Sequence, residues 1–287
     1  MTRIAQIRPL APGLHLVATP IGTARDITLR ALDVLASADV IAAEDTRTTR
    51  HLMDLHGIPL GERRLIPYHD HNGAAVRPRL LDLMEGGKSL AYASDAGTPL
   101  VADPGFALAR DAIARGIAVT GAPGPSAVTA ALMIAGLPTD RFLFAGFLPP
   151  AKGARRRVLG ELGPVPATLV FFESAKRLLE TLKEIGATLG EERQIAVCRE
   201  LTKKFEEVRR GTPGEVVEHY TAHPPKGEVV LLIDRNRAGA SAEDMEAALR
   251  HAMKDMSLKD AARQVAEDLG LARRDVYQAA LALDGEG

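Results

Sequence analysis

Short apolar runs alternate with segments of helical periodicity along residues 14–123. Four runs are predicted to be strands, Leu14–Pro20, Asp39–Asp45, Ser89–Asp95 and Ile117–Pro123. Four segments have the pattern of helices, Thr28–Ser37, Thr46–Leu55, Ala74–Glu85 and Pro104–Arg115. Continuous apolar strands that alternate with helices are typical of a parallel sheet covered on both faces. The pattern therefore predicts an N-terminal α/β domain over residues 13–122.

The pattern changes after the segment GAPGPSAV, where we place the joint between two domains. Five further strands are predicted, Phe142–Pro149, Thr168–Ser174, Ile195–Leu201, Phe205–Thr212 and Glu228–Asp234. The connection between the third and fourth of these strands is too short for a helical crossover, so this pair is expected to be antiparallel. We therefore predict a second α/β domain with a mixed sheet over residues 123–236.

A helical tail is predicted for residues 237–287, after the polar linker RNRAGAS. The helical pattern covers Ala242–Leu283, and Ser241 and Ser257 are the expected N-caps. Two short helices around a turn at Gly270 have the form of a helix-turn-helix hairpin.

Composition narrows the class of protein. The 287 residues include 36 basic and 37 acidic side chains, so net charge neither favours nor opposes a polyanionic partner. One cysteine, Cys198, excludes an intrachain disulfide framework and fits a reducing cytoplasm. No signal peptide is expected, and no apolar run approaches the roughly 20 residues that span a bilayer, so no membrane partner is expected.

Three polar, glycine-bearing or acidic loops follow predicted strands of the first domain: ATPIGTARDIT, AEDTR and SDAGTP. In parallel sheets, ligands bind beyond the carboxyl ends of the strands. Gly97 allows a ligand to approach the backbone closely, and Asp95 can accept hydrogen bonds from ribose hydroxyls or an amine. A tight turn alone explains one such loop, but three at one sheet edge favour a binding site.

No GxGxxG and no GxxxxGK[ST] segment is present, which excludes the dinucleotide fingerprint and the P-loop.

Other motifs leave alternatives open. Ser126 is either a simple N-cap or a hydroxyl that faces an interdomain cleft. His69 and His71 lack a Cys or Glu partner at ligand spacing, so we expect no metal and interpret them as a polar cleft rim. Asp103, before Pro104, is interpreted as an N-cap with proline at the first helical position.

Clusters of positive charge are candidates for RNA contacts, because lysine and arginine neutralise phosphates. A purely solubilising role is the alternative, since acidic residues such as Glu206 and Glu207 are close in sequence. The candidates are Arg47, Arg155, Arg156, Arg157, Lys176, Arg177 and Lys204.

The ordered segments TPIG, AEDTR, HDHN, SDAGTPL, PGPSA, FFES, RELTK and KGEVVL resemble one family. This family is the ribosomal RNA small subunit methyltransferase I group of the tetrapyrrole methylase superfamily, and the resemblance runs from about Gly13 to the C-terminus. It implies two α/β domains with S-adenosylmethionine between them, and a homodimer. It also implies 2′-O-methylation of a cytidine in 16S rRNA, at the decoding centre of the 30S subunit.

Site residues follow from the resemblance by matching motifs. The implied cofactor residues are Pro20, Gly22, Asp95, Ala96, Gly97, Thr98, Ser126, Ala127, Phe172, Glu173 and Gly227. A ribose hydroxyl is a poor nucleophile, so a base or a cation near it would help. Asp45 is our first candidate, with Lys203 as its electrostatic partner, and His69, His71 and Glu200 remain open.

Two rival functions are a precorrin-type methyltransferase on the same fold and a non-catalytic RNA-binding assembly factor. The basic segments, RELTK, HDHN and the helical tail argue against the first rival. The intact SDAGTP and PGPSA segments argue against the second.

Overall fold

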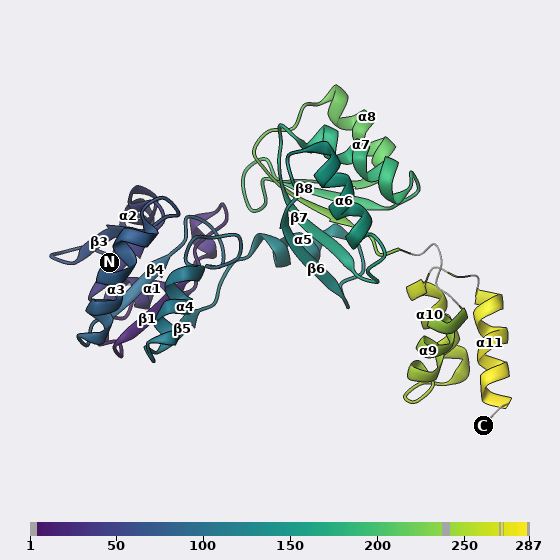
Figure 1. The fold of residues 1–287 in the computed structure, drawn as a ribbon, viewed down its shortest axis with the longest axis horizontal. Helices are drawn as coiled ribbons and strands as arrows, with labels where there is room; N and C mark the ends of the chain where they lie inside the picture. The colour runs from purple at the N-terminus through teal and green to yellow at the C-terminus, as the bar shows by residue number, and fades with distance from the viewer. Residues whose placement is uncertain (1–4, 237–241, 270, 272, 286–287) are drawn as a thin grey trace.

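The computed structural model describes residues 5–236, 242–269, 271 and 273–285. The chain forms two sheets, and Figure 1 shows each with its helices and the helices of residues 242–285 as a separate group. The predicted N-cap Ser241 and the predicted turn residue Gly270 lie outside the described residues. None of the described helices is long and apolar enough to cross a membrane.

The first sheet has the order β3-β2-β4-β1-β5, and every neighbouring pair is parallel, as predicted. Its strands are β1 (Gly13–Val17), β2 (Val40–Ala43), β3 (Arg64–Pro67), β4 (Ser89–Ala93) and β5 (Val119–Ala122). The edge strand β3 was not predicted. It has only four residues, is partly exposed and ends in proline, so it lacks the apolar pattern of the central strands.

Helices cover both faces of this sheet, because alternate strand residues point to opposite sides. Its helices are η1 (Ala24–Asp26), α1 (Leu29–Ser37), α2 (Thr46–Leu55), α3 (Gly73–Glu85) and α4 (Phe106–Ala114). Ile41 and Ala91 pack with α1 and α2 on one face. Ala42 and Leu90 pack with α3 and α4 on the other. The result is a three-layer unit of helices, sheet and helices.

Helix α4 begins at Phe106, which corrects the expected start at Pro104. Asp103 caps the preceding turn instead of the helix. Its Oδ1 accepts hydrogen bonds from the backbone N–H of Gly105 and from the hydroxyl of Tyr92, each at 2.8 Å.

The second sheet has the order β6-β7-β10-β8-β9 and is mixed, as predicted. Its strands are β6 (Phe142–Phe147), β7 (Thr168–Ser174), β8 (Ile195–Arg199), β9 (Glu207–Gly211) and β10 (Glu228–Ile233). The β6–β7 pair is parallel and the other three are antiparallel, including β8–β9. The short connection between β8 and β9 was therefore interpreted correctly.

One face of the second sheet is covered by α6 (Lys152–Leu162), α7 (Leu178–Leu189) and α8 (Pro213–Ala222). The other face packs against α5 (Ala127–Ala135), whose buried side chains include Ala131 and Leu132. Ile21, from the loop after β1, joins this same core. The loop after β1 thus packs against the core of the second sheet.

The tail helices are α9 (Ala242–Ala252), α10 (Leu258–Leu269) and α11 (Arg273–Gly285). They form a core of their own around Leu249, Val265 and Val276. Ser257 caps α10 as predicted, because its Oγ accepts the backbone N–H of Asp260 at 3.2 Å.

Candidate active site

The SDAGTP loop after β4 is fixed to the loop after β1. Thr19 and Gly97 exchange two backbone hydrogen bonds of 3.0 Å. The Ser94 hydroxyl donates to the Gly97 carbonyl at 3.0 Å, and the Thr98 hydroxyl donates to the Pro125 carbonyl at 3.0 Å. Gly97 has φ +81°, a conformation that favours glycine. The loop is therefore held in one shape before any ligand binds.

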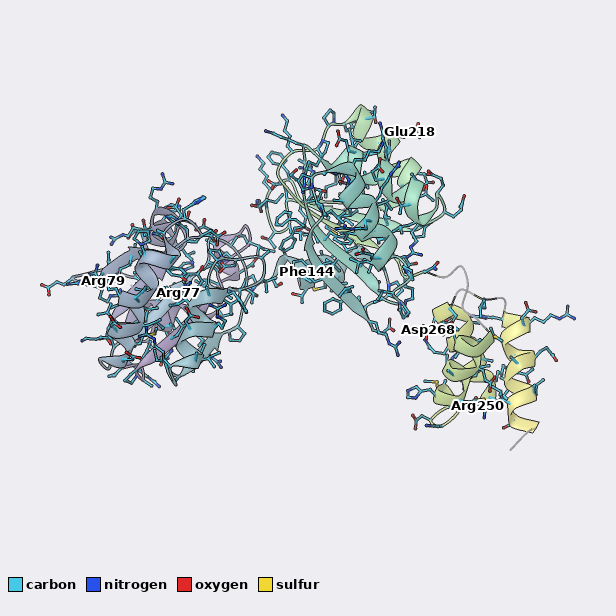
Figure 2. All side chains as sticks on the ribbon, in the orientation of Figure 1. Arg77, Arg79, Phe144, Glu218, Arg250 and Asp268 are labelled. Atoms are coloured by element: carbon cyan, nitrogen blue, oxygen red, sulfur yellow. The ribbon has the colours of Figure 1, made fainter. Side chains whose placement is uncertain are left out.

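A cavity of about 410 Å³ lies between this loop and the second sheet. We call it the interdomain cavity. This size lies within the range of small-molecule sites. Phe172 forms part of its apolar wall, and Phe144 (Figure 2) contacts the Phe172 ring edge-on at 4.8 Å between centroids. Its lining residues from the predicted cofactor set are Ala96, Gly97, Thr98, Ser126, Ala127, Phe172, Glu173 and Gly227.

Ser126 begins α5, but its hydroxyl makes no capping hydrogen bond. Because Ser126 lines the interdomain cavity, its hydroxyl is available for a ligand. This arrangement supports the cleft-facing interpretation of the PGPSA segment over simple capping.

A larger cavity of about 560 Å³ lies at the opposite end of the second sheet. It is bounded by the end of α5 and the connection between α7 and β8. None of the predicted site residues lines it, so size alone does not identify the active site.

Three predicted cofactor residues, Pro20, Gly22 and Asp95, do not line the interdomain cavity. A Cβ on Gly22 would lie 2.5 Å from Thr202 Oγ1 and 2.6 Å from Lys203 Cγ. The Thr23 N–H also donates to Thr202 Oγ1 at 3.1 Å. Gly22 therefore permits close contact between the loop after β1 and the loop after β8, which closes one side of the cleft.

Glu44 is a cavity residue that the sequence analysis missed. Burial raises the pKa of Glu44, and the negative charges of Asp95, Asp103 and Asp70 raise it further. The backbone N–H of Asp95 donates to Glu44 Oε2 at 3.3 Å. Burial likewise raises the pKa of Asp95, whose Oδ1 accepts the Asp45 N–H at 2.8 Å. Glu44 is thus an acceptor with elevated proton affinity at the cavity wall.

Asp45 is the N-cap of α2. Its Oδ1 accepts the Arg47 N–H at 2.8 Å, and its Oδ2 pairs with Arg47 Nη2 at 2.6 Å. The hydrogen bond from the Arg47 side chain lowers the pKa of Asp45 to about 2. A carboxylate of this acidity is a weak base near neutral pH. Its catalytic role stays a prediction.

Glu200 and Lys203 are engaged with each other at the rim of the second sheet. Lys203 Nζ lies 3.0 Å from Glu200 Oε1 and 2.9 Å from Glu228 Oε2. Burial opposes the charge of Lys203, but these two hydrogen bonds raise its pKa overall. The Glu228 N–H lowers the pKa of Glu200, and Gly227 leaves room for that carboxylate. Their catalytic roles also stay predictions.

His69 does not line the interdomain cavity. Its backbone N–H donates to Asn72 Oδ1 at 2.9 Å, and its ring lies 6.0 Å from that of His71. Its Nδ1 is buried without a hydrogen-bond partner. Among the described residues, no group of three or more His, Cys, Asp and Glu side chains could hold a metal ion.

The candidate RNA contacts divide into exposed and structural cations. Arg155 is only 2% exposed and packs in α6, which corrects its assignment to an RNA-binding surface. Arg177 pairs with Glu173 at 2.6 Å and donates to the Leu148 carbonyl at 3.1 Å. Arg156 is half exposed and pairs with Glu184. The other exposed members are Arg47, Arg157, Lys176 and Lys204.

Glu173 has a structural role beside the cavity, and its removal is expected to cost about 3 kcal/mol of stability. Its side chain is fully buried, pairs with Arg177, and accepts the Thr181 hydroxyl at 2.7 Å. Glu173→Ala leaves these partners unpaired. Urea unfolding measures the loss, and the exposed Glu161→Ala is the control, expected within about 0.5 kcal/mol of the parent. Equal stability of the two variants would contradict this role.

The site is thus a cavity between two α/β domains, each built on one sheet. The family model Tetrapyrrole (Corrin/Porphyrin) Methylases matches residues 13–217, and RsmI C-terminal HTH domain matches residues 239–284. The chain belongs to the tetrapyrrole methylase family.

Curated relatives cover nearly the whole chain. One from Mesorhizobium japonicum, named Ribosomal RNA small subunit methyltransferase I, is 48% identical over 98% of this chain and 96% of its own length. A relative of the same name from Escherichia coli O157:H7 is 42% identical over 95% of this chain and 96% of its own length.

Solved structures share the fold at low sequence identity. Cobalt precorrin-4 methyltransferase has a TM-score of 0.58 and 19% identity, covering 77% of this chain and 94% of its own. Diphthine synthase has a TM-score of 0.59 and 15% identity, covering 77% of this chain and 89% of its own.

Proposed function

We propose that this protein transfers a methyl group from S-adenosylmethionine to the ribose 2′-hydroxyl of a cytidine in 16S rRNA. The observation that carries the proposal is the 48% identity, along nearly the full length of both chains, to a relative named Ribosomal RNA small subunit methyltransferase I. The family match over the tail favours this function over a tetrapyrrole substrate. The interdomain cavity supplies the binding site.

The cavity residues fit S-adenosylmethionine. Gly97 and Gly227 line the cavity with positive φ, and no side chain separates their backbone from a ligand. Phe172 supplies an apolar wall suited to a purine ring, and the Ser126 hydroxyl is free to bond a polar group. Glu44 can accept a hydrogen bond from an amine or a hydroxyl. The cofactor, when bound, supplies a methyl group on a good leaving group.

Positioning is the main task of the protein in such a reaction, potentially worth about 7–11 kcal/mol. The fixed SDAGTP loop and the contact of Gly22 with Thr202 restrict how the two walls of the cavity can move relative to each other. A neutral ribose hydroxyl gains nucleophilicity when a nearby base accepts its proton. Glu44 suits this step better than Asp45, because it lines the cavity and its pKa is raised.

We also propose the domain bounds, the oligomeric state and the RNA contacts of the protein. We assign the domains to residues 13–122, 123–236 and 237–287. The protein is proposed to act as a cytoplasmic homodimer on the 30S subunit, and analytical ultracentrifugation tests the dimer. The exposed cations proposed to contact RNA are Arg47, Arg156, Arg157, Lys176 and Lys204.

The direct test incubates the purified protein with methyl-labelled S-adenosylmethionine and 30S subunits from cells that lack it. We expect label in 16S rRNA, and mass spectrometry of nuclease digests should place it on the ribose of one cytidine. A precorrin substrate and a reaction without RNA are the controls. Label in the tetrapyrrole, or no label in rRNA, would overturn the proposed function.

A further inference from the structure

The helical tail concentrates its positive charge in one place. Residues 242–285 carry six basic and nine acidic side chains, a formal net charge of −3. Four of the six basic side chains nevertheless line a single hollow between α10 and α11, which has a volume of about 470 Å³. We call this hollow the tail groove. Its lining residues are Lys259, Asp260, Ala262, Arg263, Arg273, Arg274 and Tyr277.

Two of these four cations are free to bind a ligand. Arg263 pairs with Asp260 at 3.1 Å, and Arg273 pairs with Glu267, which lies outside the lining set. Lys259 and Arg274 are exposed and form no ion pair within the part of the tail that the structure describes. Asp260 is the one acidic residue among those that line the groove. The groove therefore has a net positive charge on a negatively charged tail.

Tyr277 adds a second kind of surface to the tail groove. It lines the hollow, and its side chain is 39% exposed. An exposed aromatic ring beside cations can stack on a nucleobase while the cations contact phosphates. The exposed apolar side chains Met256 and Leu281 do not line the groove.

We propose that the tail groove binds an RNA strand, with Lys259 and Arg274 on phosphates and Tyr277 stacked on a base. The tail then serves as a second RNA contact, separate from the interdomain cavity. The assignment of the strand to 16S rRNA rests on the proposed function. The core around Leu249, Val265 and Val276 keeps the groove in shape, since α10 and α11 pack through it.

The experiment measures binding of the full-length protein to protein-free 16S rRNA and to 30S subunits over a series of salt concentrations. The groove variant is Lys259→Ala with Arg274→Ala. The matched control is Lys254→Ala with Arg250→Ala, which removes the two basic residues of the tail that do not line the groove. Arg250, labelled in Figure 2, is on α9 and pairs with Glu246. Circular dichroism checks that both variants fold.

The groove variant is expected to bind both RNAs about tenfold more weakly, and its salt slope should fall by about 1.5 because two phosphate contacts are lost. The control should keep the affinity and slope of the parent. Tyr277→Leu should weaken binding about fivefold or more without changing the salt slope, since stacking is not ionic.

Three results would overturn the proposal: parent-like binding by the groove variant, an equal loss in the control, or a loss confined to 30S subunits. The last result would assign the groove to a ribosomal protein. Methyl transfer is measured in parallel. If the groove variant binds RNA more weakly as expected but the parent transfers no methyl group, the proposed function alone is rejected. If the parent transfers methyl groups but the groove variant binds RNA like the parent, this inference alone is rejected.

Discussion

Gly97→Val is expected to weaken binding of S-adenosylmethionine at least about tenfold, the effect of losing roughly 1.4 kcal/mol. Gly97 lines the interdomain cavity with φ +81°, and an added Cβ would lie 3.3 Å from Ile21 Cγ2. A branched side chain there must displace either Ile21 or the loop that is bonded to Thr19. Either shift moves the backbone away from the ligand.

Gly116→Val is the matched control for this experiment. Gly116 also has positive φ, +71°, but it is exposed, and nothing lies within 4 Å of its added Cβ. The two variants therefore share the backbone strain, and only one changes the cavity. Isothermal titration calorimetry measures the affinity, and thermal melting confirms the fold. Equal affinities in the two variants would reject Gly97 as a cavity determinant.

The two-sheet fold could be predicted because its central strands are continuously apolar. Ser89–Ala93 is buried at every position, so its sequence alone indicates a strand covered on both faces. The edge strand Arg64–Pro67 has no such signal, because a partly exposed strand needs few apolar residues. The antiparallel β8–β9 pair was predictable from connection length, which restricts the geometry more strongly than propensity does.

The cavity was predictable in outline from strand-end loops, but the roles of single residues were not. Gly22 meets Thr202, a contact between residues far apart in sequence that only the packed structure reveals. Arg155 could have been recognised as buried. It lies four residues before the buried Leu159, so both occupy one face of α6. The run of three arginines obscures this periodicity, because the side chains of Arg156 and Arg157 are exposed while that of Arg155 is buried.

The roles of Glu44 and Asp45 also could not be told apart from the sequence. The AEDTR segment offers two adjacent carboxylates, and sequence alone cannot say which one faces the ligand. In the structure, Asp45 caps α2 and pairs with Arg47, while Glu44 lines the cavity. Of these two adjacent residues, one therefore caps a helix and the other faces the cavity.

Glu44→Gln is expected to lower the single-turnover rate of methyl transfer by about 10²–10⁴-fold, the usual effect of losing a positioned base. Glutamine keeps the size of the side chain but cannot accept a proton. Asp45→Asn is the matched variant one residue away, and asparagine caps a helix about as well as aspartate. Its rate should stay close to that of the parent. Saturating cofactor and 30S subunits ensure that binding limits neither rate.

The pH dependence gives a second, independent readout. Burial raises the pKa of Glu44, so the base becomes protonated, and the rate of the parent falls, at a higher pH than for an ordinary glutamate. This acidic limb should disappear in Glu44→Gln and persist in Asp45→Asn. The reverse pattern, with a large loss in Asp45→Asn and none in Glu44→Gln, would return the role of base to Asp45. In that case the acidic limb of the parent would lie near pH 2, where Asp45 titrates.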